Sequence, residues 1–71
     1  MKQETRNRLA LAHSALKNGY EVEVLFGGHR LQVRSLLFTD DMIRFGLQDG
    51  SLMMLDPDAQ FAIIQSATPK V

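Results

Sequence analysis

The sequence contains no cysteine and no tryptophan. The absence of cysteine excludes disulfide bonds, zinc sites built on thiolates, and a cysteine nucleophile. An excess of charge of one sign is also missing, because eight lysine and arginine residues balance eight aspartate and glutamate residues. A chain with zero net charge has no global field that attracts nucleic acid or an anionic membrane, so such binding requires a local patch.

Long apolar runs are absent as well. No run approaches the roughly 18 residues that a membrane span needs, and the first residues are more polar than a signal peptide. We therefore expect a cytoplasmic protein without membrane contact. The serines lack a Gly-x-Ser-x-Gly element and an accompanying acid-base set, and the two histidines lack a third metal ligand at a suitable spacing. The sequence predicts no enzymatic activity, no cofactor and no metal site.

The length of the chain predicts one domain over residues 1–71, because a chain this short buries only roughly 60% of its unfolded surface and cannot support two cores. An amphipathic helix is predicted over about residues 4–17. Its apolar residues Leu9, Ala12 and Leu16 recur at helical spacing, and Asn18-Gly19 is a C-terminal stop signal.

After the helix the apolar period changes to two, which predicts strands over about residues 20–26, 30–37, 42–48, 51–55 and 61–65. Gly27-Gly28 can adopt the positive φ angles of a two-residue hairpin turn. A turn there places Val24 opposite Leu31 and Val22 opposite Val33, so apolar side chains meet on one face. Strand 30–37 then has Leu37 facing inward.

Asp49-Gly50 is the second tight-turn signal. A two-residue turn there sets Leu47 against Leu52 and Phe45 against Met54, again with apolar residues facing inward. One N-terminal helix followed by five short antiparallel strands predicts a mainly β fold. In a chain of this size the strands close best as a strongly bent, five-stranded small β-barrel of SH3-like dimensions.

Several apolar residues are predicted to point away from the core. Together these outward residues leave too much exposed apolar surface for a solitary monomer. Strands 51–55 and 61–65 are also predicted to present unpaired edges, and apolar edges are usually covered by another chain. The sequence therefore predicts a homo-oligomer, and its interface candidates are Leu36, Met53, Leu55 and Ile64.

Polar side chains gather on the opposite face of the second strand. Arg30, Gln32 and Arg34 alternate there, and the register places Arg44 diagonal to Arg34 and Gln48 opposite Gln32. Guanidinium and amide groups at this spacing can bind phosphates and base edges, and a donor from His29 can join them. The alternative is a solvated strand face whose arginines pair with the glutamates of the first strand.

The spacing of four residues resembles the first motif of the Sm-like (LSm/Hfq-type) family: Gly28, Leu31, Phe38 and Met42. Thr39 stands where the family has aspartate and Ile43 where it has asparagine. The segment Leu55-Asp56-Pro57-Asp58 stands where the family carries Arg-Gly or Tyr-Lys-His. These departures fall on the family's uridine pocket.

The resemblance implies an Sm-like ring of about five to seven subunits, closed by strand 51–55 of one protomer and strand 61–65 of the next. It also implies non-catalytic binding of single-stranded RNA or DNA, with a role in RNA or DNA processing. The alternative function is an SH3-like structural or protein-interaction module that binds no nucleic acid.

Loop aspartates at 40, 41, 56 and 58 are a further candidate site. Repeated around a ring, their carboxylates can hold a hard cation, but aspartate is also an ordinary turn residue.

Overall fold

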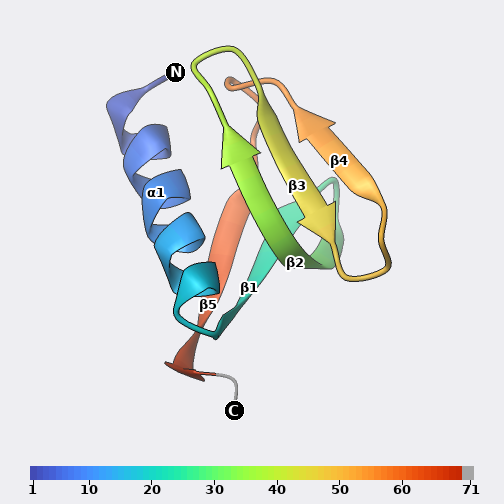
Figure 1. Ribbon diagram of the computed structural model, residues 1–71. Helices are drawn as coiled ribbons and strands as arrows, with labels where there is room; N and C mark the ends of the chain where they lie inside the picture. Colours follow the sequence, from blue (N-terminus) through green and yellow to red (C-terminus); the bar gives the residue numbers. More distant parts are fainter. Residues whose placement is uncertain (70–71) are drawn as a thin grey trace.

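The computed structural model describes the backbone of residues 1–69 and the side chains of residues 1–66. It consists of one helix and five strands: α1 (Gln3–Lys17), β1 (Tyr20–Phe26), β2 (His29–Phe38), β3 (Ile43–Leu47), β4 (Leu52–Leu55) and β5 (Ala62–Pro69) (Figure 1). All neighbouring strands are antiparallel, and they form a single sheet in the order β4-β3-β2-β1-β5. The predicted fold class, an N-terminal helix followed by a small bent antiparallel sheet, is confirmed.

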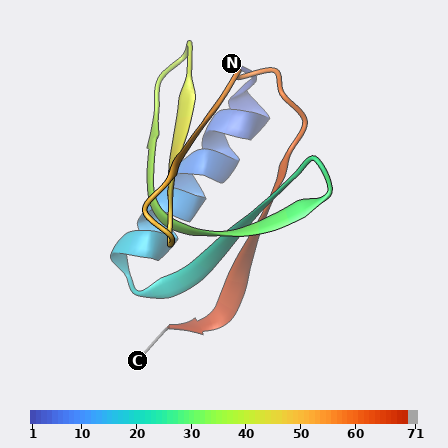
Figure 2. The same ribbon diagram turned by 90° about the vertical axis from the view of Figure 1, so that its right-hand side faces the viewer.

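Strand β2 forms the corner of the sheet, and its curvature is visible in Figure 2. Its first half pairs with β1 as far as Val22 opposite Val33, and its second half pairs with β3 starting from Val33 opposite Leu47. One extra residue, Arg34, then separates this pair from the next, Ser35 opposite Gly46. A β-bulge of this kind bends the strand, so β2 can serve two differently oriented halves of the sheet.

The helix packs on β1, β2 and β5 and closes the core. It buries Leu9, Ala12 and Ala15, whose spacing places them on one face. The two alanines are small, which lets the helix backbone approach the sheet closely. The remaining core residues come from the strands: Val22, Val24, Val33, Leu36, Ile43, Phe45, Leu47 and Leu55. The ring of Phe45 meets the ring of Phe61 edge to face, with 5.9 Å between the centroids.

The two glycine-containing boundaries on either side of β1 are as predicted. The N–H groups of Asn18 and Gly19 donate to carbonyls of the last helical turn, and Gly19 has φ of 85°, which ends the helix in the left-handed region. Gly27 and Gly28 have φ of 58° and 79°, and Phe26 pairs with His29 across them. This two-residue turn sets the predicted register of β1 against β2.

The predicted facing of Leu36 and Leu37 is wrong. Leu36 is predicted to face outward but is 5% exposed in the core, whereas Leu37 is predicted to face inward but is 54% exposed. The bulge at Arg34 is the reason, because an extra residue reverses which side chains face the core beyond it.

The predicted facing of β4 is also reversed. Met53 and Leu55 face the core, while Leu52 and Met54 are exposed. The β3–β4 hairpin has three loop residues instead of two: the N–H of Leu47 donates to the carbonyl of Ser51, and Gly46 pairs with Leu52. Gly50 still has the predicted positive φ, 90°. Gly50 is the last residue of a four-residue turn in which its N–H donates to the Leu47 carbonyl. This arrangement gives the hairpin one more loop residue than predicted.

Strand β5 is longer than its predicted range of 61–65, because it pairs with β1 from Ala62 opposite Leu25 to Pro69 opposite Tyr20. Ile64 faces outward, as predicted, and is 38% exposed. Its neighbours Phe61 and Ile63 pack against the core. Among the side chains of residues 1–66, the large apolar residues of the sheet that are exposed are therefore Leu37, Leu52, Met54 and Ile64.

The bulge makes a direct prediction for the two neighbouring leucines. Leu36→Ala should lower the free energy of unfolding by about 2–5 kcal/mol, because it opens a cavity in the core. Leu37→Ala should change it by no more than about 0.5 kcal/mol, since its side chain faces solvent. Urea denaturation followed by circular dichroism measures both. The opposite ranking of the two variants would mean that β2 has no bulge at Arg34.

Candidate nucleic-acid interface

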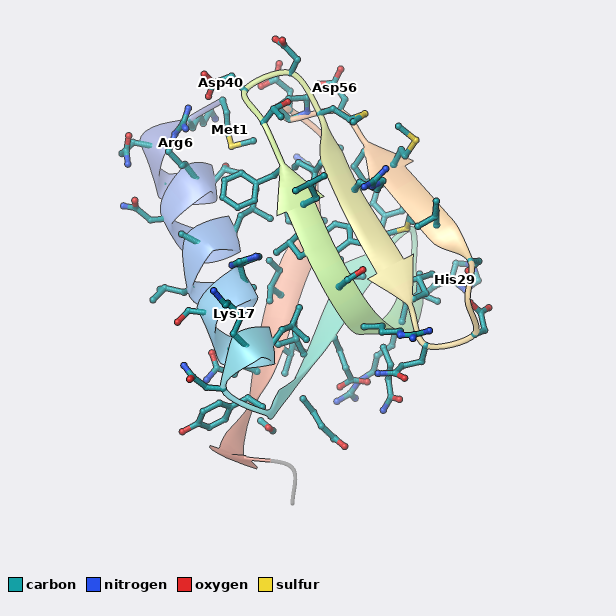
Figure 3. All side chains as sticks on the ribbon, in the orientation of Figure 1. Met1, Arg6, Lys17, His29, Asp40 and Asp56 are labelled. Atoms are coloured by element: carbon teal, nitrogen blue, oxygen red, sulfur yellow. The ribbon has the colours of Figure 1, made fainter. Side chains whose placement is uncertain are left out.

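Arg30 lies near the tip of the β1–β2 hairpin and is bound to an acidic side chain. Its Nε and one terminal nitrogen both lie 2.9 Å from Oε1 of Glu23. The hydrogen bond from Arg30 to Glu23, together with the charge of that carboxylate, raises the pKa of Arg30 above its ordinary value. For Arg30, therefore, the alternative prediction is confirmed: its guanidinium pairs with a glutamate of β1. His29 lies at the exposed end of the same hairpin (Figure 3).

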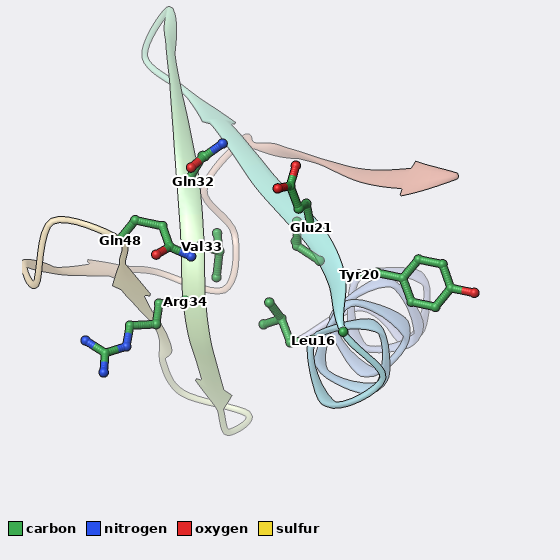
Figure 4. A pocket seen from close by; sticks show the side chains of 9 residues that line it. Leu16, Tyr20, Glu21, Gln32, Val33, Arg34 and Gln48 are labelled. Carbon is green, nitrogen blue, oxygen red and sulfur yellow. The ribbon is translucent and has the colours of Figure 1, made fainter. Parts of the chain in front are cut away.

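Gln32 and Gln48 are neighbours, as the sequence predicted. The backbone N–H of Gln48 donates to the carbonyl of Gln32 at 3.1 Å. Together with Arg34 they line one side of a crevice of about 400 Å³, whose other side includes Leu16 and Glu21. Figure 4 shows the Arg34 side chain extending from β2 away from Leu16, and the Gln48 side chain, which follows β3, extending toward β2.

Arg34 also lines a second hollow, of about 220 Å³, between β2 and the helix. This hollow exists because β1 pairs with β2 only as far as Val33, so the helix is the neighbour of the following part of β2. His13 and Lys17, one helical turn apart, line its other wall. Within residues 1–66, Arg34 has no ion pair, whereas the arginines at 6, 8 and 30 each have one.

The sequence prediction missed Lys17 and His13 as neighbours of Arg34. Their spacing of four residues shows that they share a helix face, but only the tertiary fold shows that this face lies beside β2. The spacing of His13 and Lys17 can be read from the sequence, but the strand that lies beside them cannot.

Arg44 does not join this group, so the predicted diagonal contact with Arg34 is wrong. Arg44 pairs with Leu37 of β2 and with Met54 of β4. The bulge at Arg34 moves it one residue further along β2 than an unbulged register would place it. The predicted patch is thus divided into a paired arginine, a cluster around Arg34, and an isolated Arg44.

Three loop aspartates, Asp40, Asp49 and Asp56, have carboxylates with structural roles. Asp56 accepts a hydrogen bond from the backbone N–H of Asp58, and Asp49 accepts hydrogen bonds from both the hydroxyl and the N–H of Ser51. Asp40 forms an ion pair with Arg6 of the helix, at the same end of the molecule as Asp56 (Figure 3). In the part of the chain that the structure describes, no group of three or more potential ligands is arranged to hold a metal ion.

Ile43 and Thr39, the two residues that depart from the first Sm-like motif, both have roles in the fold of this chain. Ile43 is fully buried in the core. The hydroxyl of Thr39 accepts a hydrogen bond from the N–H of Asp41 in the β2–β3 loop. An apolar residue inside the core cannot contact a base in the way that an exposed amide can.

No protein-family model, curated protein or solved structure matches this chain. Within residues 1–69, no helix is both long and apolar enough to cross a membrane.

The turn at Asp49 provides a pH-dependent test of the β3–β4 loop. Hydrogen bonds from the Ser51 hydroxyl and N–H lower the pKa of Asp49 below its ordinary value. The stabilisation is therefore fully present above the unfolded-state pKa of about 3.9 and is lost as the pH falls through the lower folded-state pKa. Ser51→Ala should raise the pKa of Asp49 in an NMR titration of the carboxyl carbon. The same pKa in both proteins would contradict this loop geometry.

Proposed function

We propose that this chain is a non-catalytic, Sm-like binding module that assembles into a homo-oligomeric ring and binds single-stranded nucleic acid, RNA in particular, around Arg34. The site consists of Arg34 with Gln32 and Gln48 on one side and with Lys17 and His13 on the other. The two parts of the proposal, assembly and ligand, have separate support and separate tests.

Assembly is supported by the two edges of the sheet. Strands β4 and β5 are its terminal strands, so each has one side without a neighbouring strand in the single chain. In β4, the hydrogen bond from Leu47 to Ser51 fixes the alternation of the ladder. It follows that Leu52 and Met54 direct their N–H and C=O groups toward the open side, where the β5 strand of another copy can pair with them.

Apolar side chains accompany both edges. Leu52 and Met54 are 64% and 58% exposed on β4, and Ile64 is exposed on β5. These residues replace Leu36, Met53 and Leu55 as candidates for surface covered on assembly, because those three face the core. Pairing β4 with β5 of the next copy is a heterologous contact, and such contacts close into a ring when the rotation permits, here with about five to seven copies.

One observation supports the proposed binding of nucleic acid. Arg34 is an exposed arginine without an ion pair in residues 1–66, and it borders two hollows. A guanidinium group with free donors suits phosphate, and neighbouring amides can bind base edges. Lys17 adds a second cation from the helix. Since the net charge of the chain is zero, affinity per subunit should be modest, and repetition around a ring would increase it.

The assembly is tested with a proline at the open edge. Met54→Pro removes an N–H that points away from β3, so the β3–β4 ladder can remain while pairing with another copy is blocked. We expect multi-angle light scattering to give a ring mass for the wild type and the monomer mass for the variant, with similar circular dichroism. The control Met54→Val keeps the N–H and should keep the ring. A wild-type monomer at micromolar concentration would show the assembly proposal to be wrong.

The ligand is tested by titrating fluorescent oligo(U) and oligo(A) at several salt concentrations. Arg34→Ala should weaken both and reduce the slope of log K against log salt by about 0.7 for each phosphate that the variant no longer neutralises. Gln32→Ala should change the preference between the two oligonucleotides with little effect on the slope. Arg30→Ala is the matched control, because Glu23 already binds its guanidinium, and it should have a smaller effect than Arg34→Ala.

The outcome that contradicts the ligand proposal is equally clear. If the wild type binds no oligonucleotide at about 50 mM salt, where phosphate contacts are strongest, the protein does not act on nucleic acid. The SH3-like structural or protein-interaction module would then be the better account of the fold.

A further inference from the structure

A row of three side chains crosses the outer face of β2, β3 and β4. Leu37, Arg44 and Met54 are direct cross-strand partners, so their side chains lie on the same face of the sheet. Leu37 is 54% exposed and Met54 58% exposed. Next to this row, Gly46 has no side chain, and Leu52 extends the apolar surface along β4. We call this surface the Arg44 face.

Arg44 is an exposed cation between two apolar neighbours. No ion pair or hydrogen bond of its side chain occurs within residues 1–66. When a partner covers this face, Leu37 and Met54 exclude water from the guanidinium group. A carboxylate placed against Arg44 then forms charge-assisted hydrogen bonds in a drier environment, which strengthens them.

The charge of this face argues against two kinds of binding partner, a second copy of this chain and nucleic acid. Stacking two copies symmetrically through it brings Arg44 toward the Arg44 of the other copy, and like charges oppose that contact. Nucleic acid is favoured by clustered cations, whereas this face has one cation among apolar side chains. The complementary occupant is a protein segment in which a carboxylate lies between two apolar residues.

The spacing of the row selects the conformation of that segment. Neighbouring strands lie about 4.8 Å apart, so the outer members of the row are separated by about 10 Å. In a helix, residues i and i+7 are about 10.5 Å apart along the axis, and i+3 or i+4 lies midway. We propose that the Arg44 face binds an amphipathic helix of another protein, with apolar residues at i and i+7 and a carboxylate at i+3 or i+4.

The helix of this chain does not provide the pattern. Its one acidic residue, Glu4, binds Arg8, and the residue that would have to be apolar at i+7 is Arg8 or Asn7. The proposed partner is therefore a different protein. The inference does not depend on nucleic-acid binding, since it uses residues outside the Arg34 site. It shares Leu52 and Met54 with the β4 edge proposed for assembly, whereas Leu37 and Arg44 belong to the Arg44 face alone.

The test uses two alanine-rich helical peptides of equal length. Both carry leucine at i and i+7; one carries glutamate at i+3 and i+4, and the other carries lysine there. Fluorescence anisotropy should show that the wild type prefers the glutamate peptide by about tenfold, the scale of one hydrogen bond to a charged group. Methyl NMR should show shifts at Leu37 and Met54. Arg44→Glu should reverse the preference, and Arg44→Gln should abolish it.

The control Lys2→Glu makes the same change in net charge at an exposed position beside the start of the helix, and it should preserve the preference. Equal binding of the two peptides, binding of neither, or an unchanged preference in both Arg44 variants would overturn the proposal. Concentration-dependent shifts of the Leu37 methyls without peptide would assign the face to a second copy, since Leu37 lies away from the β4 edge. Displacement of the glutamate peptide by oligo(U) would assign it to nucleic acid. Either result would also overturn the proposal.

Discussion

The fold depends on one strand having to satisfy two neighbours that run in different directions. Strand β2 pairs with β1 before Val33 and with β3 from Val33 onward, and the extra residue at Arg34 permits the change of direction. Without that residue a flat sheet would leave the helix resting on one plane. With it, the sheet folds around Leu9, Ala12 and Ala15, and a chain of only 71 residues encloses a continuous core.

The same constraint determines the surface chemistry. The bulge leaves Arg34 beside the helix and its cations, and it shifts Arg44 to a position between Leu37 and Met54. The basic residues of a neutral chain are thereby divided between two environments, one polar and hollowed, the other apolar and exposed. The two proposed binding surfaces differ in chemistry because one residue was added to one strand, and not because their local sequences are unusual.

The features that could be predicted from the sequence are those encoded by adjacent residues. Asn18-Gly19 ends the helix and Gly27-Gly28 forms the first hairpin, because both need backbone angles that glycine adopts easily. The bulge and the three-residue loop at Gly50 were not predicted, since Leu36-Leu37 and the run Leu52–Leu55 are apolar at every position. Alternation carries no information where both faces are apolar. The neighbours of Arg34 depend on tertiary packing, which a one-dimensional pattern does not contain.

The run of four apolar residues in β4 has a consequence for how the chain folds. A slip of one residue exchanges Met53 and Leu55 for Leu52 and Met54 in the core, and burial of apolar surface hardly distinguishes the two arrangements. The choice is made by the loop, where Gly50 takes its left-handed conformation and Ser51 bonds to Asp49. A short loop closes far faster than a sheet assembles. The register of the hairpin is therefore encoded in the three residues of its loop, and substitutions there bear on which face of β4 is buried more than substitutions within the strand do.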